Sequence, residues 1–116
     1  MSDAPVLAPI NLVADLSAAG DFEKKHTPHI DVADAGEGKK TVTVTVGWGV
    51  PHPNQPDHWI TFIELYASDS PIARFDLSPV ATDPVVSVVV ALDPGTVIRA
   101  VANCNLHGLW AAEVGV

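Results

Sequence analysis

The segment Thr41–Val46 alternates threonine with valine along its whole length. Successive side chains of a β-strand point to opposite faces, so this period of two predicts a strand with one buried valine face and one threonine face. Both residue types are β-branched and favour extended backbone. The segment therefore predicts a half-buried strand, which must pack its valines against a second layer.

Other segments rich in β-branched or aromatic residues are separated by turns that contain glycine or proline. They predict strands at His29–Ala33, Trp59–Ala67, Ile72–Leu77, Val85–Val90, Thr96–Ala102 and Leu109–Val116. Val85–Val90 is almost continuously apolar, which predicts a strand covered on both faces. About seven short strands together predict an all-β fold, an immunoglobulin-like antiparallel β-sandwich.

The N-terminal part of the chain has a weaker pattern. Apolar residues at roughly helical spacing between positions 12 and 19 predict a short helix. The charged segment Asp21–Pro28 ends at a proline and is expected to form an exposed loop. A length of 116 residues is typical of one domain, and we expect an N-terminal extension at 1–20 followed by the sandwich domain at 21–116.

The chain is acidic, with 14 Asp and Glu residues against 6 Lys and Arg and a formal net charge of −8. This argues against partners that need clustered cations, namely nucleic acid and anionic membrane surfaces. Four of the six basic residues are Lys24, Lys25, Lys39 and Lys40, which form either a small positive patch or two solvated turns.

A single cysteine excludes an intrachain disulfide and a four-cysteine iron site, and it suits a reducing compartment. No apolar run is long enough to cross a bilayer, and the first ten residues do not resemble a signal peptide. We therefore expect a cytoplasmic protein.

The only cysteine opens the segment Cys104–Trp110, in which His107 and Gly108 follow it. A thiol and an imidazole on a tight turn can face one metal ion, although both are also ordinary core residues. Two further histidines, His52 and His58, bracket a loop that contains three prolines, which restrict its conformations.

Histidines concentrated at strand ends beside the sole thiol favour a mononuclear metal site over a set of unrelated surface residues. Four imidazoles and one thiolate make five ligands. This number suits iron with one open position better than structural zinc, which prefers four ligands. Calcium and magnesium prefer oxygen ligands and fit poorly.

Several motifs, in this order along the chain, resemble the superoxide reductase family. More narrowly, the chain is similar to its one-iron form, the neelaredoxin or desulfoferrodoxin-like iron domain, from about Phe22 to the C-terminus. The motifs are Lys25-His26-Thr27-Pro28, the run His52-Pro53-Asn54 with His58 six residues after His52, the strand Trp59–Tyr66, and Cys104-Asn105-Leu106-His107-Gly108-Leu109-Trp110.

The resemblance implies one iron per chain, cycling between Fe²⁺ and Fe³⁺ in a square pyramid. Its equatorial ligands would be His26, His52, His58 and His107, and its axial ligand would be the Cys104 thiolate. Superoxide would bind opposite the sulfur, accept one electron and leave as hydrogen peroxide. The family also has an immunoglobulin-like β-sandwich, as the strand pattern predicts.

The resemblance assigns catalytic roles to Lys25 and Glu23. Lys25 would attract superoxide and help to supply a proton, and a glutamate in many members ligates the oxidised iron. Here the run Glu23-Lys24-Lys25-His26 is one residue longer than in those members, so Glu23 either reaches the metal from a loop or the glutamate ligand is missing. We favour the second alternative.

Two further expectations concern residues around the site. His29 matches none of the family's ligands and is expected to be a strand or surface residue. Trp48 and Trp110 flank the ligand loops, where they either cover the site or pack in the core.

The implied partners are superoxide, a rubredoxin-like or other small electron donor, and further copies of the chain in a dimer or tetramer. Two other functions remain open. One is an iron-binding redox or nitric oxide sensor of the same fold without reductase turnover. The other is a structural sandwich whose histidines hold zinc or nothing.

Overall fold

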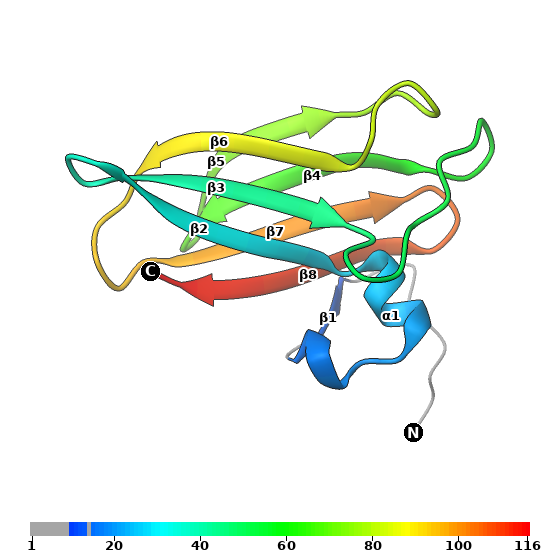
Figure 1. Cartoon of the computed structure of the whole chain (residues 1–116), viewed down its shortest axis with the longest axis horizontal. Coiled ribbons are helices and arrows are strands. Elements are labelled where there is room, and N and C mark those ends of the chain that lie inside the picture. Colours follow the sequence, from blue (N-terminus) through cyan, green and yellow to red (C-terminus); the bar gives the residue numbers. More distant parts are fainter. Residues whose placement is uncertain (1–9, 14) are drawn as a thin grey trace.

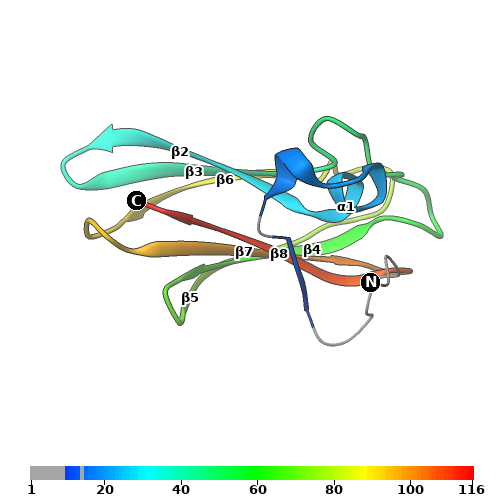
Figure 2. The ribbon, with the colours of Figure 1, turned by 90° about the horizontal axis from the view of Figure 1, so that it is seen from below.

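The computed structural model describes residues 10–13 and 15–116, which form two packed β-sheets (Figure 1). One sheet has the strand order β1-β8-β7-β4-β5 and the other has the order β2-β3-β6. The two layers are seen edge-on in Figure 2. The elements are β1 (Asn11–Leu12), the 3₁₀ helix η1 (Leu16–Ala18), α1 (Asp21–His26), β2 (Pro28–Gly36), β3 (Lys39–Val46), β4 (Ile60–Ala67), β5 (Ser70–Asp76), β6 (Val85–Ala91), β7 (Val97–Cys104) and β8 (Gly108–Gly115).

The seven predicted strands are confirmed as β2 to β8, and the predicted antiparallel sandwich with them. In β3, Val42, Val44 and Val46 are buried while the threonines are half-buried, as the alternation requires. All neighbouring strands pair antiparallel except the two-residue β1, which runs parallel to β8.

The hydrophobic core lies between the sheets and extends to the thiol. Full burial of an aliphatic side chain stabilises a fold by about 1.5–3 kcal/mol, so this cluster supplies much of the driving force for folding. Cys104 is the last residue of β7 and belongs to the same buried cluster. The buried cluster comprises Val42, Val44, Val46, Ile60, Ile63, Leu65, Ile98, Ala100, Ala102 and Cys104.

The prediction that Val85–Val90 is covered on both faces is wrong. In β6, exposed and half-buried residues alternate, because each sheet of the sandwich packs only one of its faces on the core. A run of valines does not reveal which face is covered, since every position is equally apolar.

The structure also differs from the predictions for the N-terminal part. Of the described residues between 12 and 19, only Leu16–Ala18 are helical, as the single turn η1, so the predicted short helix is confirmed in part. The prediction of an exposed loop at Asp21–Pro28 is wrong, because this segment contains α1. Phe22 and His26 are four residues apart, on one face of this helix, and His26 is only 1% exposed. The charged residues between them hide this apolar spacing in the sequence.

The segment Asn11–Leu12 of the predicted N-terminal extension joins the five-stranded sheet, with Asn11 paired to Trp110. The division into an extension at 1–20 and a domain at 21–116 stays a prediction. Neither helix in the part of the chain that the structure describes is long and apolar enough to span a membrane.

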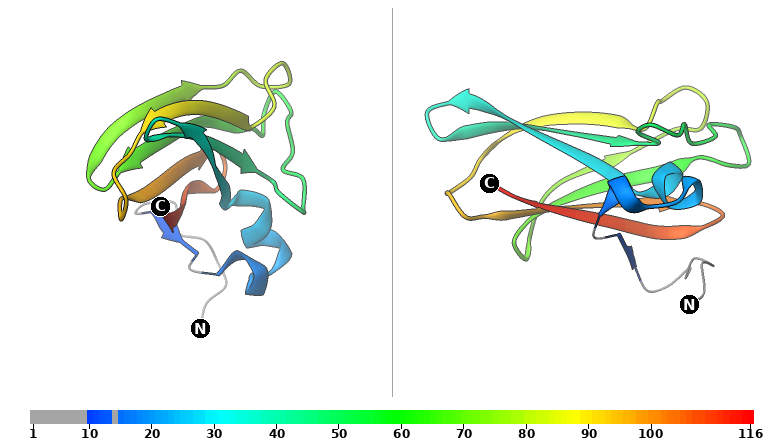
Figure 3. Two further views of the ribbon diagram at one scale, coloured as in Figure 1. Left: turned by 60° about the vertical axis from the view of Figure 1, so that its left-hand side comes forward. Right: turned by 60° about the horizontal axis from the view of Figure 1, so that its bottom comes forward.

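Three segments that are distant in sequence gather at one end of the sandwich (Figures 1 and 3). They are α1, the loop from 47 to 59 between β3 and β4, and the turn between β7 and β8. All five histidines and the cysteine lie in these segments or at the adjacent strand ends. The fold thus concentrates the metal-binding residue types at a single end.

Candidate metal centre

The structure brings the five predicted ligands together. Potential ligand atoms of His26, His52, His58 and Cys104 all lie within 4.8 Å of one another. His107 joins them, because its Nδ1 lies 3.1 Å from the Nε2 of His26 and 3.7 Å from the Sγ of Cys104. Helix α1, the β3–β4 loop and the β7–β8 hairpin each contribute to this cluster.

Hydrogen bonds to carbonyls show which ring nitrogen carries the proton in two of the histidines. The Nδ1–H of His26 donates to the Phe22 carbonyl at 2.7 Å, and that of His52 donates to the Pro53 carbonyl at 2.6 Å. A carbonyl can only accept, so both rings carry their proton on Nδ1 and offer the Nε2 lone pair. Such second bonds orient the imidazoles of metal sites.

Two ring nitrogens of the cluster are buried without a partner. The Nε2 atoms of His52 and His58 make no hydrogen bond in the part of the chain that the structure describes. An unsatisfied buried polar atom costs roughly 1–3 kcal/mol, so native proteins rarely leave one without a function. A cation between the rings would satisfy both nitrogens, and the residues present therefore fit a metal.

Burial also keeps the cluster ready for a cation. Burial, together with the charges of neighbouring histidines, lowers the pKa of His26 and of His52 to about 4. Burial also lowers the pKa of His107. These rings are neutral near pH 7, and neutral imidazole is the form that binds metals.

The thiol behaves in the opposite way. Burial raises the pKa of Cys104, which is 1% exposed, so without a cation its sulfur keeps the proton. Metal ligation requires the thiolate, and binding would release that proton. The affinity of this centre for a metal should therefore increase with pH.

The β7–β8 hairpin positions Cys104 and His107. Cys104 pairs with Gly108 in the ladder, and the turn lies between them. Gly108 has a φ of +80°, a left-handed conformation that residues with a side chain rarely adopt. This explains why glycine follows His107 and why the thiol and imidazole end up side by side.

Asn105 links the hairpin to the segment that holds His58, a role that the sequence did not reveal. Its Oδ1 accepts from the Trp59 amide at 2.9 Å, and its Nδ2 donates to the Asp57 carbonyl at 2.8 Å. Both partners flank His58, so Asn105 fixes this imidazole relative to Cys104. An asparagine directly after the thiol was the available signal, but its partners are distant in sequence.

The loop that carries His52 and His58 is tightly held. Gln55 and His58 exchange backbone hydrogen bonds at 2.9 and 3.1 Å. Gly47 has a φ of +87°, and a Cβ there would lie 2.5 Å from the His52 amide nitrogen. Only glycine permits this close approach, which places His52 against the end of β3.

Aromatic rings enclose one side of the cluster. Trp110 stacks on His26, with ring centres 5.1 Å apart, and its indole N–H donates to the His107 carbonyl. Phe22 lies against His26, His107 and Trp110 at 4.5, 5.0 and 5.8 Å. Trp110 thus covers one side of the cluster, which is one of the two roles left open for it, whereas sequence reasoning missed Phe22.

His29 and Trp48 form a separate pair beside this cluster. His29 lies in β2, as expected, and its ring stacks on Trp48 with centres 3.9 Å apart. Trp48 is 50% exposed. Trp48 therefore stacks on a histidine that is not one of the predicted ligands.

The three charged residues before His26 lie in different surroundings. Lys25 contributes to the lowered pKa of His26 and of His107, so its ammonium group acts on the cluster. Lys24 instead lines a cavity of about 280 Å³ beside Trp48. A carboxylate oxygen of Glu23 lies close to Gly20, since a Cβ added to Gly20 would be 3.1 Å from this oxygen. The Glu23 carboxylate therefore lies at the start of α1.

Comparison with known proteins agrees with this geometry. Residues 18–113 match the family model described as desulfoferrodoxin. The chain belongs to the desulfoferrodoxin family. It is 36% identical over 106 residues to a superoxide reductase of Pyrococcus horikoshii, covering 83% of this chain and 91% of that one. It is 31% identical over 122 residues to the superoxide reductase of Pyrococcus furiosus, covering 89% and 98%.

Solved structures of desulfoferrodoxin relatives confirm the predicted fold. A superoxide reductase from Nanoarchaeum equitans superposes with a TM-score of 0.78 at 27% identity, covering 93% of this chain and 100% of that one. A superoxide reductase (neelaredoxin) from Ignicoccus hospitalis gives a TM-score of 0.76 at 29% identity, covering 92% and 93%.

Proposed function

We propose that this chain is a superoxide reductase, which transfers one electron to superoxide at a mononuclear non-haem iron and yields hydrogen peroxide. The observation that carries the proposal is the convergence of four imidazoles and one buried thiol, with two ring nitrogens unpartnered. The similar proteins named superoxide reductases support the choice of substrate.

The proposed ligand atoms follow from the hydrogen bonds, the unpartnered nitrogens and the distances within the cluster. They are the Nε2 atoms of His26, His52 and His58, the Nδ1 of His107 and the Sγ of Cys104. Five ligands that include imidazole and thiolate suit iron and leave a sixth position for substrate. Iron, when bound, would supply the electron that reduces superoxide.

The chain's own residues bring in the anion and the protons. Reduction of superoxide to hydrogen peroxide consumes one electron and two protons. Four neutral imidazoles and one thiolate would leave a bound iron with a net positive charge, which would attract an anion. Lys25 adds a local cation to a chain of net charge −8, which otherwise repels superoxide, and its ammonium is the proposed source of a proton through water.

Glu23 has the weaker claim to a catalytic role. Its carboxylate lies near Gly20, at the start of α1, where the exposed N–H groups of a helix favour negative charge. This placement supports a role in stabilising α1 and supports our preference that the family's glutamate ligand is missing from this chain.

Each turnover requires an electron from outside the chain, for which we propose a rubredoxin-like or other small redox protein. A buried thiol that must stay reduced suits the cytoplasm. We also propose that the chain works as a homo-oligomer.

The test is the visible absorption of the purified protein, with iron quantified on the same sample. We expect about one iron per chain and a thiolate-to-iron band that bleaches on reduction and returns under a superoxide flux. A band that does not return would indicate a redox or nitric oxide sensor. A colourless protein whose iron cannot be reconstituted would contradict both functions.

A further inference from the structure

Two neighbouring loops at the metal-binding end of the sandwich each connect one sheet to the other (Figure 1). The β3–β4 loop carries His52 and His58. The β5–β6 loop, residues 77–84, supplies none of the proposed ligands. Hydrogen bonds nevertheless join the second loop to the first at both ends and in the middle, so the two loops form one unit.

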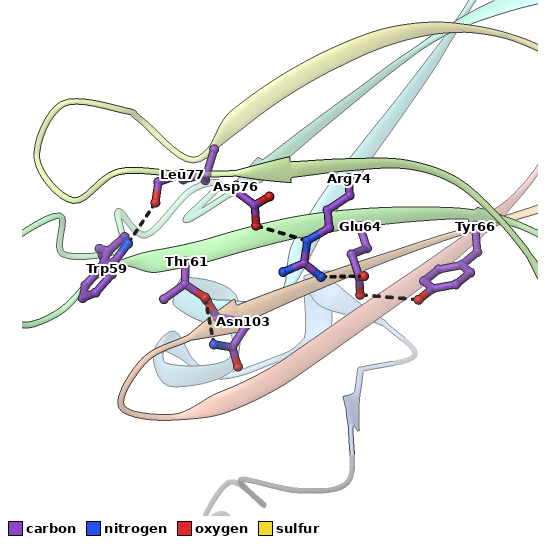
Figure 4. A network of polar contacts seen from close by, with 8 residues as sticks. All are labelled: Trp59, Thr61, Glu64, Tyr66, Arg74, Asp76, Leu77 and Asn103. Atoms are coloured by element: carbon purple, nitrogen blue, oxygen red, sulfur yellow. Dashed lines mark hydrogen bonds and ion pairs between the residues drawn. The ribbon is translucent and has the colours of Figure 1, made fainter.

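The ends of the β5–β6 loop are bonded to residues that flank the ligand-bearing loop. At its start, the Leu77 amide donates to the Thr61 carbonyl at 2.9 Å. The indole N–H of Trp59 donates to the Leu77 carbonyl at 3.2 Å, as Figure 4 shows. At its end, the Pro84 carbonyl accepts from the amide of Val46, the last residue of β3, at 2.9 Å.

Asn54 joins the middle of the two loops through three hydrogen bonds. Its Oδ1 accepts from the Val80 amide at 2.7 Å. Its Nδ2 donates to the carbonyls of Val80 and Thr82, both at 3.3 Å. The side-chain amide therefore uses its donor and its acceptor on the same partner loop. Such two-way bonding fixes the orientation of Asn54 as well as its distance from that loop.

Val80 adopts a backbone conformation that valine rarely takes. Its φ is +69°, and it is the β-branched one of three non-glycine residues with positive φ among those described. A β-branched residue is strained there. The Ala81 amide donates to the Pro79 carbonyl at 2.7 Å around Val80, which closes a γ-turn of the rare positive-φ form. Because Val80 is 57% exposed, burial of its side chain offers little compensation.

Strain of this kind persists only where surrounding contacts enforce it, and it concentrates at functional sites. The contacts from outside the turn come from Asn54, a residue of the ligand-bearing loop. A change of φ at Val80 rotates its carbonyl relative to its amide, so the two groups would no longer both face Asn54. The bonds to Asn54 and the strained turn therefore depend on each other.

Asn54 lies between the two ligands in the sequence and is coupled to both. The carbonyl that accepts the His52 Nδ1–H belongs to the peptide bond between Pro53 and Asn54. On the other side, Gln55 exchanges two backbone hydrogen bonds with His58. Fixing Asn54 thus fixes the acceptor that orients one imidazole and the bridge that places the other.

We propose that Asn54 is a positioning residue of the metal centre, which holds His52 and His58 in place by bonding to the strained Val80 turn. The inference rests on the proposed function, because it takes these two imidazoles to be ligands. Outer groups that orient metal-binding histidines typically change metal affinity by roughly 10–100-fold when they are lost. The β5–β6 loop then supports the centre although it contributes no ligand.

The first test compares iron release from the loaded wild type and from Asn54→Ala, with a chelator in excess. We expect release from Asn54→Ala to be at least about tenfold faster. The matched control is Gln55→Ala, which truncates the exposed side chain next along the same loop and leaves the backbone bonds to His58 intact. Val80→Gly accepts a positive φ without strain and keeps both bonding groups, so it should release iron as slowly as the wild type.

The electron paramagnetic resonance of the ferric form separates positioning from a loss of stability. We expect the signal of Asn54→Ala to broaden or split, because His52 takes more than one orientation, while Gln55→Ala keeps the wild-type signal. A merely less stable fold would leave the signal of the loaded protein unchanged. Equal release rates and signals in Asn54→Ala and the wild type would overturn the inference, as would fast release from Val80→Gly.

If Asn54→Ala fails to fold, as circular dichroism would reveal, Asn54→Asp decides. Aspartate has the same shape and keeps the acceptor for the Val80 amide, but it loses both bonds that Nδ2 donates. Iron release should again be faster than in the wild type, and an unchanged rate would overturn the inference. A wild type that binds no iron would contradict the proposed function itself, and the inference with it.

Discussion

Cys104 and His107 lie on a β-hairpin, whereas His26 ends a helix of six residues. The hairpin is part of the five-stranded sheet, and its ladder fixes the thiol within the hydrophobic core. A helix as short as α1 is not stable by itself in water. It is held against the cluster by the ring of Phe22, which contacts His107 and Trp110, and by the stacking of His26 on Trp110.

This difference divides the metal centre into two parts with different roles. The sheet side, with the β3–β4 loop anchored on it through Asn105, supplies rigid ligands, so changes there should abolish the centre. The α1 side supplies one ligand together with Lys25, so changes there should adjust affinity and rate. The following predictions test that division, from the largest expected effect to the smallest.

Cys104→Ser should have the largest effect. Serine is close to cysteine in shape but does not supply a thiolate, so we expect loss of the thiolate-to-iron absorption and of most of the activity. Circular dichroism would show that the sandwich persists, and the iron content of the same sample would show how much metal remains. A visible band that survives in the variant would mean that Cys104 is not a ligand.

Gly47→Ala should displace His52, because the new Cβ would lie 2.5 Å from its amide nitrogen. Gly49→Ala is the matched control, since Gly49 has a similar φ of +83° but open space around it. Both variants should lose about 1 kcal/mol of stability from backbone strain. Only Gly47→Ala should also weaken iron binding, by roughly 10–100-fold in a chelator competition. Equal iron affinities would show that His52 does not depend on this contact.

Phe22→Ala should loosen α1 without removing a ligand. We expect iron affinity to fall by roughly tenfold as His26 loses its support, while the thiolate-to-iron band keeps its position. Phe62→Ala is the control, because Phe62 packs under Arg74 on the outer face of the five-stranded sheet. If iron release is equally fast in both variants, α1 is not held by Phe22.

Lys25→Ala should affect the rate but not the metal content. Loss of the cation beside the cluster should slow the reaction with superoxide by roughly tenfold and flatten its dependence on ionic strength. Lys24→Ala removes the same charge from a side chain that lines the cavity beside Trp48, so its effect should be smaller. Pulse radiolysis of the two variants would compare them, and equal rates would remove the special role of Lys25.

Glu23→Gln should have the smallest effect. If the carboxylate only stabilises the start of α1, the variant should lose about 0.5 kcal/mol in thermal unfolding and keep the ferric absorption spectrum unchanged. A shift of the ferric band would instead place Glu23 at the metal.

The sequence predicted the sheet side of the molecule better than the α1 side. The Thr41–Val46 alternation records burial directly, and all seven predicted strands were found. Helix α1 was missed because its two inward residues, Phe22 and His26, are separated by charged residues that suggest a loop. The valine run of β6 was misinterpreted because a uniform apolar segment carries no information about which face is covered.

The ligand types were visible in the sequence, but the groups that orient them were not. Asn105, Phe22 and Gly47 act through contacts with residues that are distant in sequence or through backbone conformation. Such contacts depend on how the loops pack at the end of the sandwich, which no local pattern encodes.

The central claim is that one iron is held by the four converging imidazoles and the Cys104 thiolate. Iron K-edge X-ray absorption of the reconstituted protein tests it most directly, with Cys104→Ser as the reference. We expect one sulfur and four imidazole nitrogens around the iron, and loss of the sulfur contribution in the variant. A first shell without sulfur, or with fewer than four imidazoles, would contradict the account.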